Sequence, residues 1–267
     1  MQGNVDPRII LISQWPKIKN AEFELIEKIR ETKFEIIVVD YLGFDIETGR
    51  CVNTATLYQE YDFAIALHFE TPKFLNIRTF YWVANPLAYM HLNSHYRDWI
   101  LPSLRSFDGY LYNGSDLIKN QIESLSSCTE MAQKINYYFY QSCSKRVIAN
   151  PELNVVPKIF YCGINWERCL DEQGRSSGLL TLLDSQKNID FYGPRFFEGA
   201  ETWSGFSSYV DEIPFDGVTL LNTMKKYRAV LAISSPAHLN SRTSSGRVFE
   251  GIAAGVPIIS DDNPHVR

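Results

Sequence analysis

The stretch TSSGRVFEGIAAG, residues 243–255, places small polar residues directly before an amphipathic helix. The free backbone N–H groups and the dipole at the N-terminus of a helix attract anions. Ser244, Ser245 and Gly246 therefore suit a phosphate group, since the glycine permits close approach. The alternative is a plain helix cap by Ser244 or Ser245, and spacing alone leaves both interpretations open.

Charged side chains frame the same stretch. Arg242 and Arg247 could add charge-assisted hydrogen bonds to a phosphate. Glu250 falls one turn inside the expected helix, where its carboxylate could accept hydrogen bonds from two neighbouring hydroxyls, as a ribose offers. The alternative for Glu250 is a solvated surface glutamate, and for Arg242 a side chain that faces water.

A second candidate for chemistry lies in the first half of the chain. His68 and Glu70 lie at the carboxyl end of the expected strand YDFAIALHF, residues 61–69: His68 is near the end of this run and Glu70 directly follows it. A histidine titrates near neutrality and could take a proton from an acceptor hydroxyl, as could a carboxylate. The alternative is a hydrogen-bonded histidine beside a helix-capping glutamate.

Two successive series of strands and helices must position these residues. Near-continuous apolar strands separated by helices predict parallel sheets covered on both faces, which bind ligands at the carboxyl ends of their strands. The first series has expected strands at 8–14, 34–41, 61–69, 79–86 and 107–114, and helices at 20–32 and 129–144. The second has strands at 158–163, 189–194, 229–235 and 257–260, and helices at 176–186, 217–227 and 246–255.

Between the two series lies ANPELNVVPK, residues 149–158. Proline disfavours helix and lacks a backbone donor, so Pro151 and Pro157 indicate a linker. We therefore expect two domains that divide near 150–157, an N-terminal one over residues 1–150 and a C-terminal one over 151–267, with the ligand between them.

Composition narrows the function classes. Of the 267 residues 45% are hydrophobic, the net charge is −5, and no apolar run is long enough for a membrane span, which together indicate a soluble protein with little affinity for nucleic acid. The five cysteines show no metal-ligand spacing and indicate reduced thiols in a cytoplasmic protein. Neither a G-x-G-x-x-G fingerprint nor a P-loop is present, which argues against a dehydrogenase or a P-loop NTPase.

These motifs resemble a known family. RVFEGIAAGVPIISDD is similar to a stretch of the GT-B glycosyltransferases, and within them the chain looks closest to the glycosyl transferases group 1 of the CgeB-like type. The likeness rests on KIFYCGINWER, IDFYGP and the segment 224–260, in that order, and covers about 158–263. It implies an α/β fold of two Rossmann-like domains (GT-B), of which the first is the acceptor side and the second binds the nucleotide sugar.

The resemblance also assigns roles to residues. Glu250 matches the ribose-binding glutamate of the family, and Ser244 to Arg247 match its phosphate-binding turn. After the strand 158–163, Asn165, Arg168 and Arg175 are candidates for the diphosphate. In YVDEIPFDG, residues 209–217, Ile213 and Phe215 are candidates for the apolar face of the base site. Surface salt bridges for the arginines and a core position for Phe215 remain the alternatives.

Two features depart from the family pattern. Many retaining members have a second glutamate eight residues before the ribose-binding one, and here that position is Arg242, so the retaining mechanism cannot be carried over. Complete members continue beyond the strand 257–260, so the C-terminal domain is expected to be incomplete. A truncated protein, a piece of a larger polypeptide and a minimal variant all stay open.

The sequence therefore predicts a metal-independent glycosyltransferase without a cofactor, which moves a sugar from a nucleotide-sugar donor to a glycan, lipid-linked or protein acceptor. The expected setting is bacterial surface-polysaccharide or glycoconjugate synthesis in the cytoplasm, with room for peripheral association with the inner face of the membrane. The alternatives are a non-catalytic nucleotide-sugar or glycan-binding domain of a larger synthase, and a sugar-nucleotide epimerase.

Overall fold

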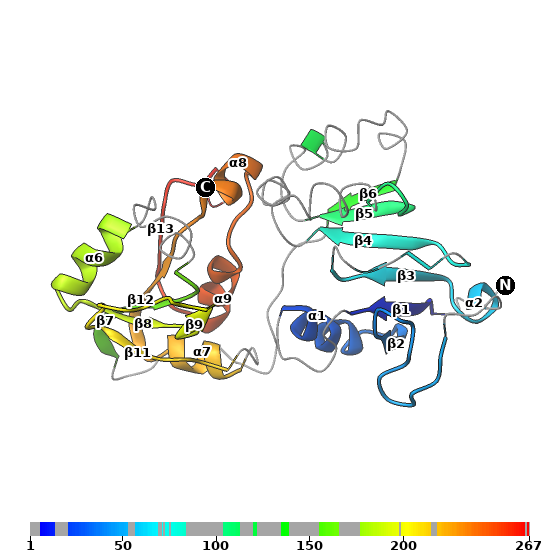
Figure 1. Cartoon of the computed structure of the whole chain (residues 1–267), viewed down its shortest axis with the longest axis horizontal. Helices are drawn as coiled ribbons and strands as arrows, with labels where there is room; N and C mark the ends of the chain where they lie inside the picture. Colours follow the sequence, from blue (N-terminus) through cyan, green and yellow to red (C-terminus); the bar gives the residue numbers. More distant parts are fainter. Residues whose placement is uncertain are drawn as a thin grey trace. The chain divides into compact units, whose positions relative to one another are not determined.

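A computed structural model gives the fold of the chain (Figure 1). The residues that it describes are 6–13, 21–52, 57–68, 71, 73–74, 76–83, 104–112, 120–121, 135–138, 155–165, 177–197, 199–214, 218–264 and 266. The chain forms two compact units: unit 1 consists of Met1–Ser142 and Ala237–Thr243, and unit 2 consists of Cys143–Pro236 and Ser244–Arg267. Each unit is built on its own parallel sheet.

Unit 1 contains a parallel sheet with the strand order β2-β1-β3-β4-β5-β6 (Figure 1). Both faces of its central strands are buried, because β-branched and aromatic residues fill them without a polar alternation. The elements are β1 Arg8–Ile12, α1 Ala21–Arg30, β2 Glu35–Val39, α2 Leu57–Glu60, β3 Phe63–Ala66, β4 Thr79–Val83, β5 Gly109–Tyr112 and β6 Ile135–Tyr138.

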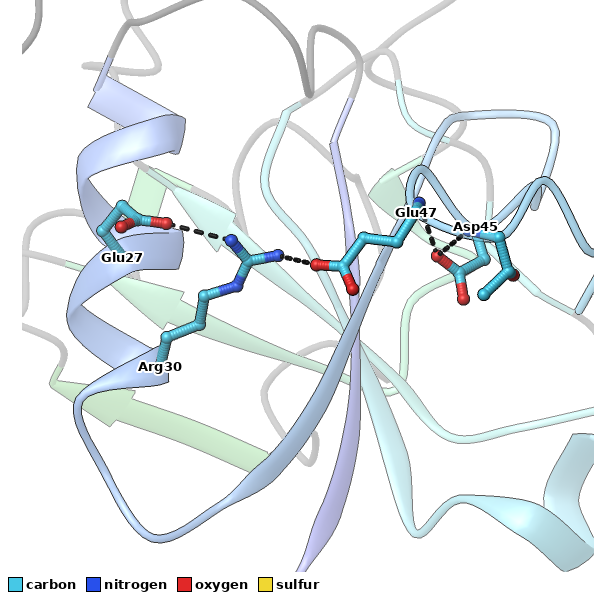
Figure 2. A network of polar contacts seen from close by, with 5 residues as sticks. Glu27, Arg30, Asp45 and Glu47 are labelled. Carbon is cyan, nitrogen blue, oxygen red and sulfur yellow. Dashed lines mark hydrogen bonds and ion pairs between the residues drawn. The ribbon is translucent and has the colours of Figure 1, made fainter.

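An ion-pair network fixes α1 against the loop that follows β2 (Figure 2). Arg30, in the last turn of α1, lies between two carboxylates: its Nη1 is 3.0 Å from Glu27 Oε1 and its Nη2 is 2.6 Å from Glu47 Oε1. The backbone N–H of Glu47 in turn donates to Asp45 Oδ1 over 2.8 Å. Because the Arg30 and Glu47 side chains are 37% and 69% exposed, their ion pair shapes the loop more than it stabilises the unit.

Unit 2 contains a second parallel sheet, with the strand order β11-β8-β7-β12-β13, and a small antiparallel pair, β9 and β10. The elements are β7 Val156–Cys162, α6 Ser177–Ser185, β8 Ile189–Tyr192, β9 Phe196–Phe197, β10 Ala200–Glu201, β11 Tyr209–Asp211, α7 Thr219–Met224, β12 Tyr227–Ala232, α9 Gly246–Ala254 and β13 Ile258–Ser260. Helix α8, Pro236–Ser241, follows β12 and belongs to unit 1 from Ala237 onward.

Two hydrophobic clusters cover the two faces of the unit 2 sheet. On one face, Phe160 and Val230 of the sheet pack with Leu220 of α7 and Ala254 of α9. On the other face, Phe191 and Leu231 pack with Leu180 of α6 and with Trp203. The sheet is therefore the middle layer of three, and α9 is held against it by an apolar face.

Two expectations about the secondary structure were wrong. The expected helix at 129–144 contains strand β6, Ile135–Tyr138, which pairs with β5 in parallel. The sequence INYY is β-branched and aromatic, a composition that favours an extended chain beside another strand. Pro157, assigned to the linker, is the second residue of β7 and lies where the pairing of β7 with β12 shifts register, a place at which a strand tolerates the missing N–H of proline.

Candidate functional site

The N-terminus of α9 is formed by the residues that the sequence singled out. Ser245 is the N-cap, with extended backbone angles (φ −65°, ψ 146°), and its side chain accepts a hydrogen bond from the N–H of Arg247 over 3.3 Å. Gly246 begins the helix, and the N–H of a first helical residue has no partner within the helix. The capping interpretation is thus correct for Ser245, and it leaves the N–H of Gly246 at the helix end for an anion.

Ser244 is in a different position. Its side chain is buried, with 3% of the residue exposed, and across the described parts of the chain its Oγ has no hydrogen-bond partner. A buried hydroxyl without a partner costs about 1 to 3 kcal/mol, so such groups are rare unless something else satisfies them. An anion at the N-terminus of α9 would supply that acceptor.

Arg247 and Glu250 form an ion pair one turn into α9. Arg247 Nη1 lies 2.5 Å from Glu250 Oε2, and the two side chains are only 15% and 19% exposed. Burial by itself lowers the pKa of the Arg247 guanidinium, but the attraction of Glu250 and of the Cys162 and Tyr161 side chains outweighs it, so the pKa is raised. The pair therefore holds two opposite charges in a largely water-excluded place.

The carboxyl end of β7 lies beside this pair. Cys162 is the last residue of β7; burial raises the pKa of its thiol, and the positive charge of Arg247 opposes that rise. Glu212, just after β11, also acts on the same thiol. Cys162 and Ile213 pack against the cluster that α7 and α9 cover, so Ile213 lies on the same sheet face as α9, the helix that carries Arg247.

Side-chain hydrogen bonds join the segments that follow β12 and β13. They were not predicted from the sequence. Asp261 Oδ1 accepts from Ser234 Oγ over 2.9 Å, Asp261 Oδ2 accepts from the N–H of Ser234 over 3.2 Å, and Asn263 Nδ2 donates to Ser234 Oγ over 2.9 Å. Ser234 and Asn263 are buried. The signal was the run SDDNP after a strand, in which polar side chains follow an apolar run without a turn glycine.

The carboxyl ends of β7 and β8 approach each other closely at two glycines. A Cβ on Gly193 would lie 2.1 Å from the carbonyl oxygen of Gly163, and Gly193 has φ +141°, so only glycine fits. Trp203 lies against this point: its buried Nε1 is 3.3 Å from the same Cβ position, and no hydrogen-bond partner for it is found among the described residues.

The remaining predicted site residues are spread over the chain. Arg242 is exposed and belongs to unit 1; Asn165 is buried, three residues beyond the end of β7. His68 lies two residues after β3, in unit 1, and its carbonyl accepts from the N–H of Thr71 over 3.0 Å. Glu70, Arg168, Arg175 and Phe215 lie outside the described residues. The described residues contain no group of three or more His, Cys, Asp or Glu side chains that could hold a metal ion.

Arg242 has an unusual backbone conformation because it ends helix α8. It has φ 49°, in the left-handed region, and it follows α8 with the pair of hydrogen bonds that closes a helix: Arg242 N to Leu239 O over 3.1 Å and Thr243 N to His238 O over 2.9 Å. Arg242 is therefore the residue that terminates α8.

No helix within the described residues is long and apolar enough to cross a lipid bilayer.

No protein-family model and no curated protein matches the chain. Among solved structures, it is similar to an alpha-glucosyltransferase in complex with UDP and a 13-mer DNA containing a HMU base, at 11% identity and a TM-score of 0.55, over 96% of this chain and 80% of that one. It also matches Arabidopsis thaliana UGT89C1 complexed with UDP-L-rhamnose, at 10% identity and a TM-score of 0.49, over 96% and 79% of the two chains. The co-structure of S. aureus MnaA with UDP matches at 13% identity and a TM-score of 0.46, over 97% and 86%.

The likeness to the alpha-glucosyltransferase is one of fold, since so few residues are identical. It agrees with the two parallel sheets described above and with the fold class expected from the sequence. The chain thus has an α/β fold with two parallel, Rossmann-like sheets, as expected for the GT-B fold.

Proposed function

We propose that this chain is a glycosyltransferase that moves a sugar from a nucleotide-activated donor to a hydroxyl acceptor. The observation that carries the proposal is the N-terminus of α9. There the buried hydroxyl of Ser244, which has no hydrogen-bond partner among the described residues, precedes the helix, and the Arg247–Glu250 pair follows within one turn. Hydroxyl, helix dipole and guanidinium all favour phosphate, whereas the carboxylate favours a diol. A nucleoside diphosphate carries both groups at neighbouring places.

The proposed chemistry follows from these groups. The bond between the anomeric carbon and the diphosphate breaks, the acceptor oxygen forms a new bond to that carbon, and the acceptor proton passes to a base. Negative charge builds up on the leaving diphosphate, and Ser244, the Gly246 N–H and Arg247 would stabilise it. His68, with Glu70, stays the proposed base for the acceptor hydroxyl.

The other site residues enter the proposal as secondary contacts. Ile213 packs on the sheet face that also holds Arg247, which supports its proposed role against the nucleotide base, together with Phe215. Asn165 follows β7 closely and remains a candidate for the diphosphate, as do Arg168 and Arg175. We also propose the finer assignments drawn from the sequence: the CgeB-like type, surface-polysaccharide or glycoconjugate synthesis in the cytoplasm, and a glycan, lipid-linked or protein acceptor.

The test is calorimetric titration of the full chain with UDP, GDP and ADP, followed by incubation with the matching nucleotide sugars and measurement of released nucleotide. We expect one nucleoside diphosphate to bind and its sugar conjugate to be consumed when an acceptor is present. Failure of all three nucleotides to bind would overturn the proposal. For the variant Glu250→Gln, the matched control is Glu201→Gln. Glu201 is an acidic residue of unit 2 whose exposed pair with Arg195 lies in the β9–β10 region.

A second candidate function is a binding domain without turnover. It is favoured by Arg242, which stands where retaining family members have a glutamate and which here terminates α8. Binding of a nucleotide sugar without release of nucleotide, with every acceptor class tested, would support this candidate. Interconversion of UDP-sugars in the absence of any acceptor would instead indicate the epimerase alternative.

A further inference from the structure

Arg247 and Glu250 form a short, buried ion pair with each other. Their atoms are 2.5 Å apart and both side chains are more than four-fifths buried. A buried carboxylate keeps its charge only when a cation or several hydrogen-bond donors compensate the lost hydration. For Glu250 the compensation in the structure is the guanidinium of Arg247.

The guanidinium is itself held in one place. The backbone N–H of Arg247 donates to the Ser245 cap, and its side chain, which is only 15% exposed, donates from Nη1 to Glu250 Oε2. A guanidinium has five N–H donors; Nη1 donates to Glu250, and within the described part of the chain no other acceptor for this guanidinium is found, which leaves donors for a phosphate. Arg247 can therefore contact a phosphate without releasing the carboxylate.

We propose that Arg247 is a positioning residue for ribose recognition: by holding the Glu250 carboxylate in one orientation, it makes the site specific for ribonucleotides over their 2′-deoxy counterparts. The inference rests on the proposed function and goes beyond it, because it assigns to Arg247 an effect on a hydroxyl that it does not touch. It also predicts that phosphate and ribose recognition are coupled through one ion pair.

One ratio distinguishes a positioning role of Arg247 from independent contacts by Arg247 and Glu250: the affinity for a ribonucleotide divided by the affinity for its 2′-deoxy counterpart. If Arg247 only contacts phosphate, its removal weakens a ribonucleotide and its 2′-deoxy counterpart equally, and the ratio of their affinities is unchanged. If Arg247 also positions Glu250, its removal loses the hydroxyl contact as well, and the ratio falls. The overall loss of affinity carries no such information, because both arrangements produce it.

The experiment measures the dissociation constants of UDP, 2′-deoxy-UDP, GDP, 2′-deoxy-GDP, ADP and 2′-deoxy-ADP for the full chain, and uses the base that binds best. The unchanged protein is expected to prefer the ribonucleotide roughly ten- to hundredfold, the range for one hydrogen bond to a charged group. The preference should fall towards one in both Glu250→Gln and Arg247→Ala. It should largely return in Arg247→Lys, which keeps the cation.

Each other result has a meaning. A full ribose preference in folded Arg247→Ala, with both nucleotides weakened alike, overturns the inference and leaves the proposed function intact. If no nucleoside diphosphate binds the unchanged protein, the proposed function fails first. If Arg247→Ala does not fold, as its melting curve would show, the ratio is measured on Arg247→Gln, which keeps a donor without the charge: a reduced ratio supports the positioning role and an unchanged ratio overturns it.

Discussion

At the scale of single residues, burial of the Arg247–Glu250 pair changes what Glu250 should do for stability. A carboxylate at a cleft edge would matter little for folding, but Glu250 compensates a buried guanidinium. Glu250→Gln should therefore lower the free energy of unfolding by about 1 to 3 kcal/mol, the cost of leaving a buried group poorly satisfied. Urea unfolding of the ligand-free protein measures this.

The control for that measurement is Glu201→Gln. Glu201 pairs with Arg195 over 3.1 Å, but the two side chains are 38% and 64% exposed, so the change should stay within about 0.5 kcal/mol. Equal effects of the two substitutions would contradict the view that burial makes the Arg247–Glu250 pair important.

Burial of Arg247 also means that added salt should weaken its contribution to nucleotide binding only slightly.

Arg242 gives a second prediction for a single residue. Its φ of 49° strains a residue with a Cβ, so Arg242→Gly should stabilise the chain by up to about 1 kcal/mol. Arg242→Ala removes the same side chain but keeps the strain, and should show no such gain in thermal melting. If both variants bind the nucleoside diphosphate as well as the unchanged protein, the predicted phosphate contact of Arg242 is excluded; a shared loss of affinity would support it.

At the scale of elements, the junction of β7 and β8 depends on Gly193. A Cβ there would lie 2.1 Å from the Gly163 carbonyl oxygen, so Gly193→Ala must push the two strand ends apart. We expect a loss of at least about 3 kcal/mol in urea unfolding, as for other severe backbone clashes. Gly199→Ala is the matched control: it also has a positive φ (+82°) but open space around its Cβ, and should cost about 1 kcal/mol. Similar costs for both would show that the strand ends yield easily.

A polar network across β7, β8 and β12 makes stability depend on alkaline pH. Tyr227 donates to Asp190 Oδ2 over 2.9 Å, Tyr192 lies 2.8 Å from the Tyr227 hydroxyl, and Lys158 is 2.6 Å from Asp190 Oδ1. Burial, and then the hydrogen bonds to Tyr192 and Asp190, raise the pKa of Tyr227 far above its ordinary value of 10.0. The folded chain therefore keeps this phenol proton at a pH where the unfolded chain has lost it.

The sign of the effect follows from proton binding. Above about pH 10 the unfolded state holds fewer protons than the folded state, so the free energy of unfolding falls with pH, by at most about 1.4 kcal/mol per pH unit for one phenol. Urea unfolding between about pH 9 and 11 should show this decline, and Tyr227→Phe should make it shallower. Burial likewise raises the pKa of Tyr61 and Tyr209, so some decline should remain. An unaltered slope in Tyr227→Phe would show that Tyr227 ionises in the folded state.

The pattern of elements was predictable where the hydrophobic pattern is unambiguous. RIILI and EIIVV are apolar and β-branched, which predicts strands, and they form β1 and β2. INYY could not be separated from a helix by periodicity, because its aromatic residues satisfy both patterns, and pairing with β5 decides the outcome. The short strands β9, β10 and β11 depend on their neighbours and leave little trace in the sequence.

The candidate site was predictable only as a set of residue types. A hydroxyl pair before an amphipathic helix indicates its N-terminus, and Ser245 is indeed the cap. The sequence could not tell that Ser244 would be buried with no hydrogen-bond partner among the residues that the structure describes, since burial depends on packing against distant segments. The spacing of Arg247 and Glu250, three residues apart on a helix, allowed an ion pair, but its burial is a property of the folded unit.

At the scale of the whole molecule, each compact unit has its own buried clusters: Ile10 and Leu11 belong to those of unit 1, and Phe160 and Phe191 to those of unit 2. The nucleotide contacts proposed for Ser244, the Gly246 N–H, Arg247 and Glu250 all belong to unit 2. A nucleoside diphosphate that binds there should therefore stabilise the two units unequally.

Hydrogen exchange, followed by mass spectrometry of peptides, measures this difference. With the best-binding nucleoside diphosphate at about 100 times its dissociation constant, binding adds about 2.7 kcal/mol to the stability of the binding-competent state, roughly a hundredfold slowing of exchange through unfolding. We expect that slowing in peptides of β7, β8 and β12 of unit 2, and much less in those of β1, β3 and β4 of unit 1. Glu250→Gln at the same nucleotide concentration should reduce the slowing in unit 2. Equal slowing in both units would contradict the assignment of the binding groups to unit 2, because it would require contacts of similar strength in unit 1 or unfolding of the two units as one.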